Sequence, residues 1–184
     1  MKPARLHRVF PYLEDAKKGE PGHPLYVPAT QGSGRVSNPE HYLVLYASDD
    51  PSGAVGEAFG NHALWTPALL EGPPLLAGSR RALATYEVEA EVLDLDDPVA
   101  LVDREIRPSR VVTRDRSVTQ AWALDIFRED RWAGVRWWSY HRPEWGSFGM
   151  WDVSGYTAVD IEPLEATSEA LTEAARLLNR PWRD

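Results

Sequence analysis

The order of strand-like and helix-like segments restricts the folds open to this chain more than any other feature of its sequence. Predicted strands and helices follow one another irregularly, and the last two predicted strands have only a loop between them. A doubly wound parallel sheet is built from alternating strands and helices, so this pattern disfavours it. The pattern instead predicts a mixed α/β (α+β) single domain. The predicted strands are residues 41–47, 83–92, 134–138 and 148–153, and the predicted helices begin at Ser52, Asp97, Ser117 or Thr119, and Thr167.

The clearest local pattern lies between His41 and Gly60. The run HYLVLYA is short, apolar and β-type, which is typical of a strand buried on both faces. Ser52 is a candidate N-cap for a helix that ends at Gly60. Residues 17–34 and 67–79 contain many Pro and Gly residues and are predicted to be loops. The last helix is predicted over about residues 167–178 from its apolar residues at helical spacing.

Length and composition indicate a soluble globular protein. The 184 residues fit one domain, residues 1–184, and 43% hydrophobic with 26% charged residues is an ordinary balance for such a domain. The sequence has no cysteine, which excludes disulfides and thiolate metal sites and suits a reducing compartment. No apolar run approaches the roughly 18 residues that span a bilayer. We therefore expect a cytoplasmic protein that does not contact a membrane.

The charge of the chain argues against direct binding of nucleic acid. Its formal net charge is −8, whereas sequence-independent binding of nucleic acid depends on many basic residues. Only three of the 20 basic residues are lysines. Arginine is the better residue for bidentate phosphate recognition, so this bias permits a nucleotide pocket. GC-rich coding would produce the same preference for arginine, so this bias alone does not show that a nucleotide pocket is present.

Several common site motifs are absent. The sequence contains neither GxGxxG nor GxxxxGK[ST], so it supports neither a Rossmann nor a P-loop nucleotide site. No GxSxG motif indicates an α/β-hydrolase. The five histidines show no metal-ligand spacing such as HExxH, and we expect no metal site.

Three polar residues near the predicted strand at 41–47 are candidates for a site. Arg35 follows the glycine-rich run Gly32-Ser33-Gly34, where the backbone can approach a ligand and the guanidinium can bind phosphate oxygens. Glu57 lies in an otherwise small and apolar helix, where burying a carboxylate without a partner is costly. Tyr46 ends the strand. Each also has an ordinary interpretation, namely a surface loop, a solvated helix position and a core residue.

Three blocks of the sequence together resemble the RES-domain family of toxin–antitoxin systems. The run GSGRVSNPEHYLVLYASDDPSGAVGEAF contains a Gly-Arg pair, a strand ending in a tyrosine and a helix bearing a glutamate. The early LHRVFP is similar to the family's opening strand and supplies Arg8. The later AWALDIFREDRWAGVRWWSYHRPEWGSFGMWD is similar to its third block, in which a strand ends in a serine, here Ser139. The resemblance is strongest over residues 6–152.

The chain departs from the family pattern at two positions. Val36 stands where the family has an aromatic residue after the Gly-Arg pair. Trp138 stands before the serine, where a small residue or proline is usual. Ser147, in the following loop, is a competing candidate for the role of Ser139.

The resemblance implies a fold like that of ADP-ribosyltransferases and a reaction that breaks the nicotinamide–ribose bond of NAD. Glu57 would stabilise the oxocarbenium-like transition state, and Arg8 and Arg35 would hold the pyrophosphate. Tyr46 would pack against the nicotinamide or its ribose, and Ser139 would bind the nicotinamide side or orient Glu57. NAD would be the substrate, and the reaction would need no metal or further cofactor.

The resemblance leaves several alternatives open. The products could be those of hydrolysis, of phosphorolysis or of ADP-ribosyl transfer to a protein, and a non-catalytic NAD-binding module is a further alternative. The family implies an Xre-type antitoxin as a partner, which would itself contact DNA. The oligomeric state is open, and a homo-oligomer is one alternative. The tryptophans crowded between residues 132 and 151 could form core and a partner surface, or a wall on which a base stacks.

Overall fold

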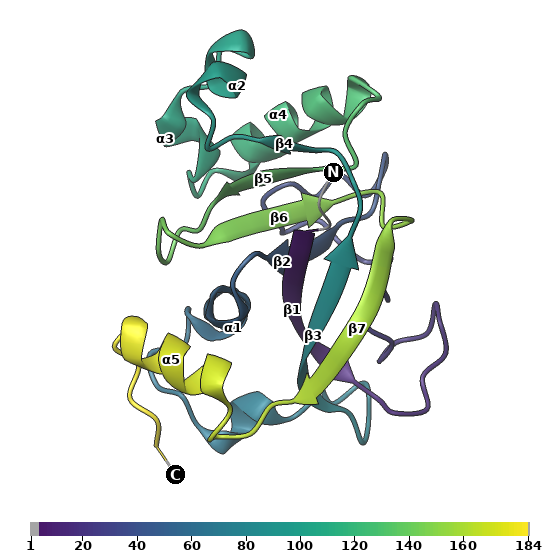
Figure 1. The fold of residues 1–184 in the computed structure, drawn as a ribbon, viewed down its shortest axis with the longest axis vertical. Helices are drawn as coiled ribbons and strands as arrows, with labels where there is room; N and C mark the ends of the chain where they lie inside the picture. Colours follow the sequence, from purple (N-terminus) through teal and green to yellow (C-terminus); the bar gives the residue numbers. More distant parts are fainter. Residues whose placement is uncertain (1–3, 184) are drawn as a thin grey trace.

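The computed structural model describes residues 4–183, in which seven strands form one sheet in the order β4-β5-β6-β2-β1-β3-β7 (Figure 1). Only β4 and β5 pair in parallel, and all other neighbours are antiparallel. The predicted α+β fold with a mixed sheet is therefore confirmed. The strands are β1 (Ala4–Tyr12), β2 (Leu45–Ser48), β3 (Arg80–Val88), β4 (Val92–Asp94), β5 (Gly134–Trp138), β6 (Gly146–Met150) and β7 (Tyr156–Pro163).

Aspartates cap three of the helices. The side chains of Asp50, Asp97 and Asp115 accept hydrogen bonds from backbone N–H groups in the first turns of α1, α2 and α4. The start at Asp97 was predicted, whereas the predicted cap Ser52 is wrong because Asp50 caps α1. Helix α4 begins at Arg116, just before the predicted starts at Ser117 or Thr119. The helices are α1 (Pro51–Phe59), α2 (Pro98–Asp103), α3 (Pro108–Val111), α4 (Arg116–Arg128) and α5 (Glu169–Leu177), with a short 3₁₀ helix η1 (Pro67–Leu70) in a predicted loop.

Helix α5 begins later than predicted, because Ser168 and not Thr167 occupies its N-cap position. The Ser168 hydroxyl accepts a hydrogen bond from the backbone N–H of Glu165 instead of capping the helix. None of the helices in residues 4–183 has both the length and the apolar character required to cross a membrane.

Strand β2 is shorter than the predicted strand at residues 41–47. The chain turns between Asn38 and Tyr42, where the backbone N–H groups of His41 and Tyr42 both donate to the carbonyl of Asn38. The side chain of Gln31 then bonds both the N–H and the carbonyl of Val44, so a glutamine amide takes the place of a neighbouring strand there. Strand β6 likewise begins and ends earlier than the predicted 148–153, and β7 was not predicted.

The sheet consists of two parts that are joined at one position. Strands β1 and β2 pair only through His7 and Ser48, whereas β1 and β3 pair over nine positions. Figure 1 shows β4, β5 and β6 running in a clearly different direction from β1, β3 and β7. Ser48 is the last residue of β2, and the sheet opens where β2 diverges from β1 before this single pair. We call the His7–Ser48 pair the sheet junction.

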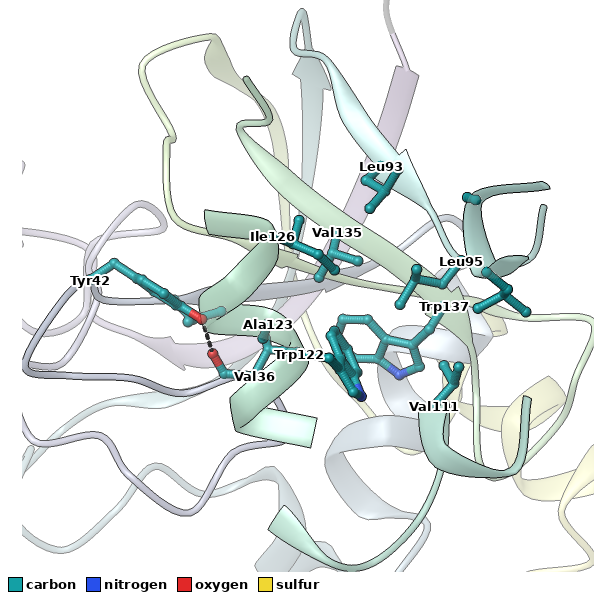
Figure 2. Close-up of a cluster of buried hydrophobic side chains, with 13 residues drawn as sticks. Val36, Tyr42, Leu93, Leu95, Val111, Trp122, Ala123, Ile126, Val135 and Trp137 are labelled. Carbon is teal, nitrogen blue, oxygen red and sulfur yellow. Dashed lines mark hydrogen bonds between the residues drawn. The ribbon is translucent and has the colours of Figure 1, made fainter. Parts of the chain in front are cut away.

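The described buried side chains form three clusters. In the first core, helices α2, α3 and α4 pack on β4 and β5, where Trp122 and Trp137 lie against each other (Figure 2). The second core joins the two parts of the sheet, since it contains Tyr86 of β3 as well as Met150 of β6. Helices α1 and α5 pack together and cover Leu83 of β3. The crowded tryptophans contribute to core packing: Trp137 and Trp145 are buried, and Trp132, Trp138 and Trp151 pack against the first core.

Candidate functional site

A cavity of about 560 Å³ lies where β1 and β2 diverge. Its volume is within the usual range for a small-molecule site. The walls come from β1, β2, the glycine-rich loop, α1, the start of α4 and the strands β5 and β6. The lining residues are His7, Arg8, Val9, Ser33, Gly34, Arg35, Tyr46, Ala47, Ala54, Glu57, Ala58, Asn61, Arg116, Trp137, Tyr140, Ser147 and Phe148.

Four of the five predicted site residues line this one cavity. Arg8, Arg35, Tyr46 and Glu57 are all in its wall, although they come from four separate segments of the chain. Ser139 is buried behind the wall, where it contacts Glu57. The structure thus brings the predicted residues together, and their chemical roles remain predictions.

Glu57 projects from α1 into the cavity, and two serines hold its carboxylate. Ser139 Oγ donates to Glu57 Oε1 at 2.5 Å, and Ser147 Oγ donates to the same oxygen at 3.1 Å. The backbone N–H of His141 donates to Ser139 Oγ, so the serine proton is directed towards the carboxylate. Glu57 itself is exposed, and its other oxygen, Oε2, has no hydrogen-bond partner among the described residues. The carboxylate is therefore both accessible to solvent and fixed in its orientation.

Both serines are expected to contribute to this arrangement, Ser139 more strongly. Ser139→Ala removes the shorter bond and also leaves the His141 N–H without its acceptor. We expect it to lower the free energy of unfolding by about 1–3 kcal/mol, as measured by urea titration. Ser147→Ala removes only the longer bond and should cost less. A larger loss in Ser147→Ala would make Ser147 the principal support of Glu57.

Two predicted arginines are fixed by backbone carbonyls. Arg8 Nη1 donates to the carbonyls of Pro24 and Tyr26, and burial lowers the pKa of Arg8. Arg35 Nη1 donates to the carbonyls of Val111 and Thr113 at 2.9 and 2.8 Å. Burial, followed by the nearby charge of Arg116, lowers the pKa of Arg35 to about 10. The pKa of Arg35 is still well above neutral, so its guanidinium is charged at neutral pH.

Tyr46 supports the glycine-rich loop as well as lining the cavity. Its hydroxyl accepts a hydrogen bond from the N–H of Val36 and lies 2.9 Å from Ser37 Oγ. A Cβ atom on Gly34 would overlap that hydroxyl. The glycine before Arg35 is therefore required for the close approach of Tyr46. Burial raises the pKa of the Tyr46 hydroxyl.

The two departures from the family pattern lie outside the cavity. Val36 is fully buried and packs in the first core with Trp137. Trp138 is partly buried against the same core, on the side of β5 that does not line the cavity. Neither residue changes the composition of the cavity wall.

Sequence reasoning missed four polar cavity residues, Arg116, Tyr140, His7 and Asn61. Arg116 is the first residue of α4, and a cation at the positive end of a helix dipole is unfavourable, which is a signal that the sequence did contain. Tyr140 is half-exposed at the cavity rim, where Arg114 donates to its hydroxyl. Burial lowers the pKa of His7, whose Nδ1 lies 3.1 Å from Thr85 Oγ1.

The cavity wall contains more positively charged than negatively charged side chains. Among the described lining residues, Glu57 is the one carboxylate, whereas three are arginines, Arg8, Arg35 and Arg116. Within residues 4–183, no three His, Asp or Glu side chains are grouped in a way that could hold a metal ion. The wall is suited to an anionic ligand that also carries or develops one positive centre.

Comparisons of the fold and of the sequence with known proteins agree with each other. In a search of solved structures, the chain is similar to the MbcT toxin of the crystal structure of the M. tuberculosis MbcT–MbcA toxin–antitoxin complex, with a TM-score of 0.62 and 17% sequence identity. The match covers 96% of this chain and 90% of that chain, and at this identity it shows a shared fold. A comparison with curated proteins finds no match. The model of the RES domain matches residues 5–177, nearly the whole chain, and the chain therefore belongs to the RES-domain family.

Proposed function

We propose that this chain is a toxin-type enzyme that binds NAD in the cavity and cleaves its nicotinamide–ribose bond by hydrolysis or phosphorolysis. One observation carries the proposal: a single fixed carboxylate and three arginines line one cavity of about 560 Å³. NAD has the complementary charges, a negative pyrophosphate and a positive nicotinamide ring. Membership of the RES-domain family and the fold shared with a toxin–antitoxin structure support the same assignment.

The chemistry follows from where charge develops. When the nicotinamide–ribose bond breaks, its electron pair stays on the ring nitrogen, which becomes neutral, and the ribose carbon becomes oxocarbenium-like. The Glu57 carboxylate stabilises that positive charge more than it stabilises the bound substrate. The bonds from Ser139 and Ser147 hold the carboxylate in place before the reaction begins. An oxygen of water or phosphate then bonds to the ribose carbon, and an attacking water releases one proton to solvent, which completes the reaction.

Nicotinamide release tests this proposal directly. The purified protein is incubated with NAD in buffers with and without phosphate, and nicotinamide and the ADP-ribose product are separated by chromatography. Free ADP-ribose indicates hydrolysis, and a phosphorylated ADP-ribose formed only with phosphate indicates phosphorolysis. Release of no nicotinamide in either buffer would contradict the proposal. A labelled protein band formed from labelled NAD in a lysate would instead indicate an ADP-ribosyltransferase.

The proposed partner is a small antitoxin protein that binds this chain and blocks access to the cavity. The fold shared with a chain of a toxin–antitoxin complex supports it. A gene beside that of this protein, encoding a helix-turn-helix protein, would provide the candidate. The two proteins should then co-purify, and nicotinamide release should fall in proportion to the antitoxin added.

Binding in the cavity is expected to weaken at high pH. The charged form of Arg35 binds the anion, and its pKa is lowered to about 10 by burial and by Arg116. The affinity for ADP-ribose should therefore be constant up to about pH 9 and fall as the pH rises through about 10. Titration calorimetry at several pH values measures this. In Arg35→Gln the affinity should be weaker throughout and lack this fall, and a parallel fall in both proteins would contradict the role of Arg35.

A further inference from the structure

Arg116 and Arg35 are two like charges held side by side in the cavity wall. Both line the cavity, and Arg116 is close enough to lower the pKa of Arg35. The Nη1 atom of Arg116 is buried and has no hydrogen-bond partner within residues 4–183. Neither guanidinium forms a salt bridge with a described residue. The pair therefore carries two positive charges that no ion pair among the described residues neutralises, although Glu57 is near enough to Arg35 to oppose the lowering of its pKa.

The position of Arg116 is unfavourable for the ligand-free protein. It is the first residue of α4, at the positive end of the helix dipole. Its neighbour Arg35 adds like-charge repulsion, and a buried donor without an acceptor loses hydration without compensation. A neutral side chain at position 116 would remove the unfavourable interaction with the helix dipole, the repulsion from Arg35 and the unpartnered guanidinium donor. A bound anion would make all three favourable.

The backbone that carries the two arginines is fixed. The buried Thr119 Oγ1 lies 2.6 Å from the carbonyl oxygen of Arg35 and 3.3 Å from that of Arg116. Gln120 Nε2 donates to the carbonyls of Gly32 and Gly34, which joins α4 to the glycine-rich loop. The two backbone positions, and the Arg35 guanidinium with its two carbonyl acceptors, are therefore in place before any ligand binds, which favours tight anion recognition.

We propose that Arg116 and Arg35 together form an anion subsite that binds the diphosphate group of a nucleotide. The inference rests on the proposed function for the identity of the substrate, NAD, but the chemistry that it assigns is that of any nucleoside diphosphate. Arg35 uses Nη1 for backbone carbonyls, and its remaining N–H groups have no hydrogen-bond partner among the described residues. Arg116 supplies the unpartnered Nη1. A diphosphate has enough oxygens to accept from both guanidiniums.

Ligand binding without turnover tests the subsite. The probe is ADP, which carries the diphosphate and lacks nicotinamide, with AMP and inorganic phosphate as comparison ligands, all measured by titration calorimetry. The variants are Arg116→Gln, Arg116→Lys and the control Arg110→Gln, which removes the same charge from an exposed position outside the cavity. Thermal unfolding of each ligand-free variant is measured in parallel.

Arg116→Gln should bind ADP about 10- to 100-fold more weakly than the wild type, since it loses hydrogen bonds between charged groups. Its melting temperature without ligand should be no lower than that of the wild type. Arg116→Lys should recover part of the affinity, and Arg110→Gln should bind ADP like the wild type. The wild type should bind ADP more tightly than AMP or inorganic phosphate.

Equal ADP affinity in Arg116→Gln and the wild type would overturn the subsite, even if the protein cleaves NAD. So would a large fall in melting temperature without loss of affinity, which indicates a structural arginine. Binding of inorganic phosphate as tight as that of ADP would also overturn it, because the site would then recognise free phosphate. ADP binding that depends on Arg116 in a protein that releases no nicotinamide would support the subsite and contradict only the proposed function.

Discussion

Glu57→Gln is expected to lower the rate of nicotinamide release by about 10²- to 10³-fold, the usual effect of removing one electrostatic contact to a transition state. Glutamine has nearly the same shape as glutamate, and its amide oxygen can accept the bonds from Ser139 and Ser147. What it lacks is the negative charge that faces the developing positive charge on the ribose. The change therefore separates the charge of residue 57 from its place in the structure. Steady-state rates with NAD and a urea titration measure the two effects.

The control for this experiment is Glu40→Gln. Glu40 is an exposed carboxylate outside the cavity wall, so its neutralisation changes the net charge of the protein equally. Its rate of nicotinamide release should match the wild type. Glu57→Gln should have a urea midpoint close to the wild type and a similar affinity for ADP-ribose. An unchanged rate in Glu57→Gln would remove the carboxylate from the mechanism.

Trp145→Ala is expected to lower the free energy of unfolding by about 3–5 kcal/mol, a large part of the stability of an ordinary domain. Trp145 is only 4% exposed, and its side chain packs directly under α1. A Cβ atom added at Gly53 would lie 3.0 Å from Trp145 Cγ, and one added at Gly56 would lie 2.5 Å from Cζ3. The two glycines let the helix backbone rest on the indole ring. Without that ring, α1 loses the surface that sets the position of Glu57.

This second prediction has two readouts and a matched control. Urea unfolding should show the loss of stability, and nicotinamide release should fall further than the fraction of unfolded protein explains. The control, Trp138→Ala, removes the same side chain from a partly buried position outside the cavity. It should cost clearly less stability and leave the rate for folded protein unchanged. Equal losses in both variants would mean that Trp145 contributes only general packing.

The sequence predicted the segments whose pattern is local. Strand β5 was predicted at its observed bounds, and α1 was predicted apart from its first residues, because apolar spacing identifies both. The cap of α1 was assigned to Ser52, although Asp50 is the better placed acceptor before Pro51. Strand β7 was missed because it is an edge strand with mostly exposed residues, so it has no apolar alternation to detect.

The residues of the candidate site also fall into two groups, those that a local sequence pattern identifies and those that only long-range contacts bring to the cavity. Arg35 and Glu57 lie within one continuous run of sequence, and resemblance to a family identified them together. Ser147 and Arg116 are brought to the cavity by the pairing of β6 with β2 and by the contact of α4 with the glycine-rich loop. Such long-range contacts leave no periodic signal in a single sequence. The dual support of Glu57 by two serines could therefore be found only in the folded chain.

The sheet junction has a consequence for how such a protein diverges. Only one residue pair connects β1 with β2 in the sheet, so the two parts are held together mainly by the buried cluster that they share, which includes Tyr86 of β3 and Met150 of β6. The other two clusters each lie on one part, and neutral drift can accumulate in either of them without compensating changes in the other. Purifying selection should be concentrated where both parts meet, at His7, Ser48 and the helix α1 that contacts strands of both. A pair of homologues can thus retain the same cavity while sharing few residues elsewhere.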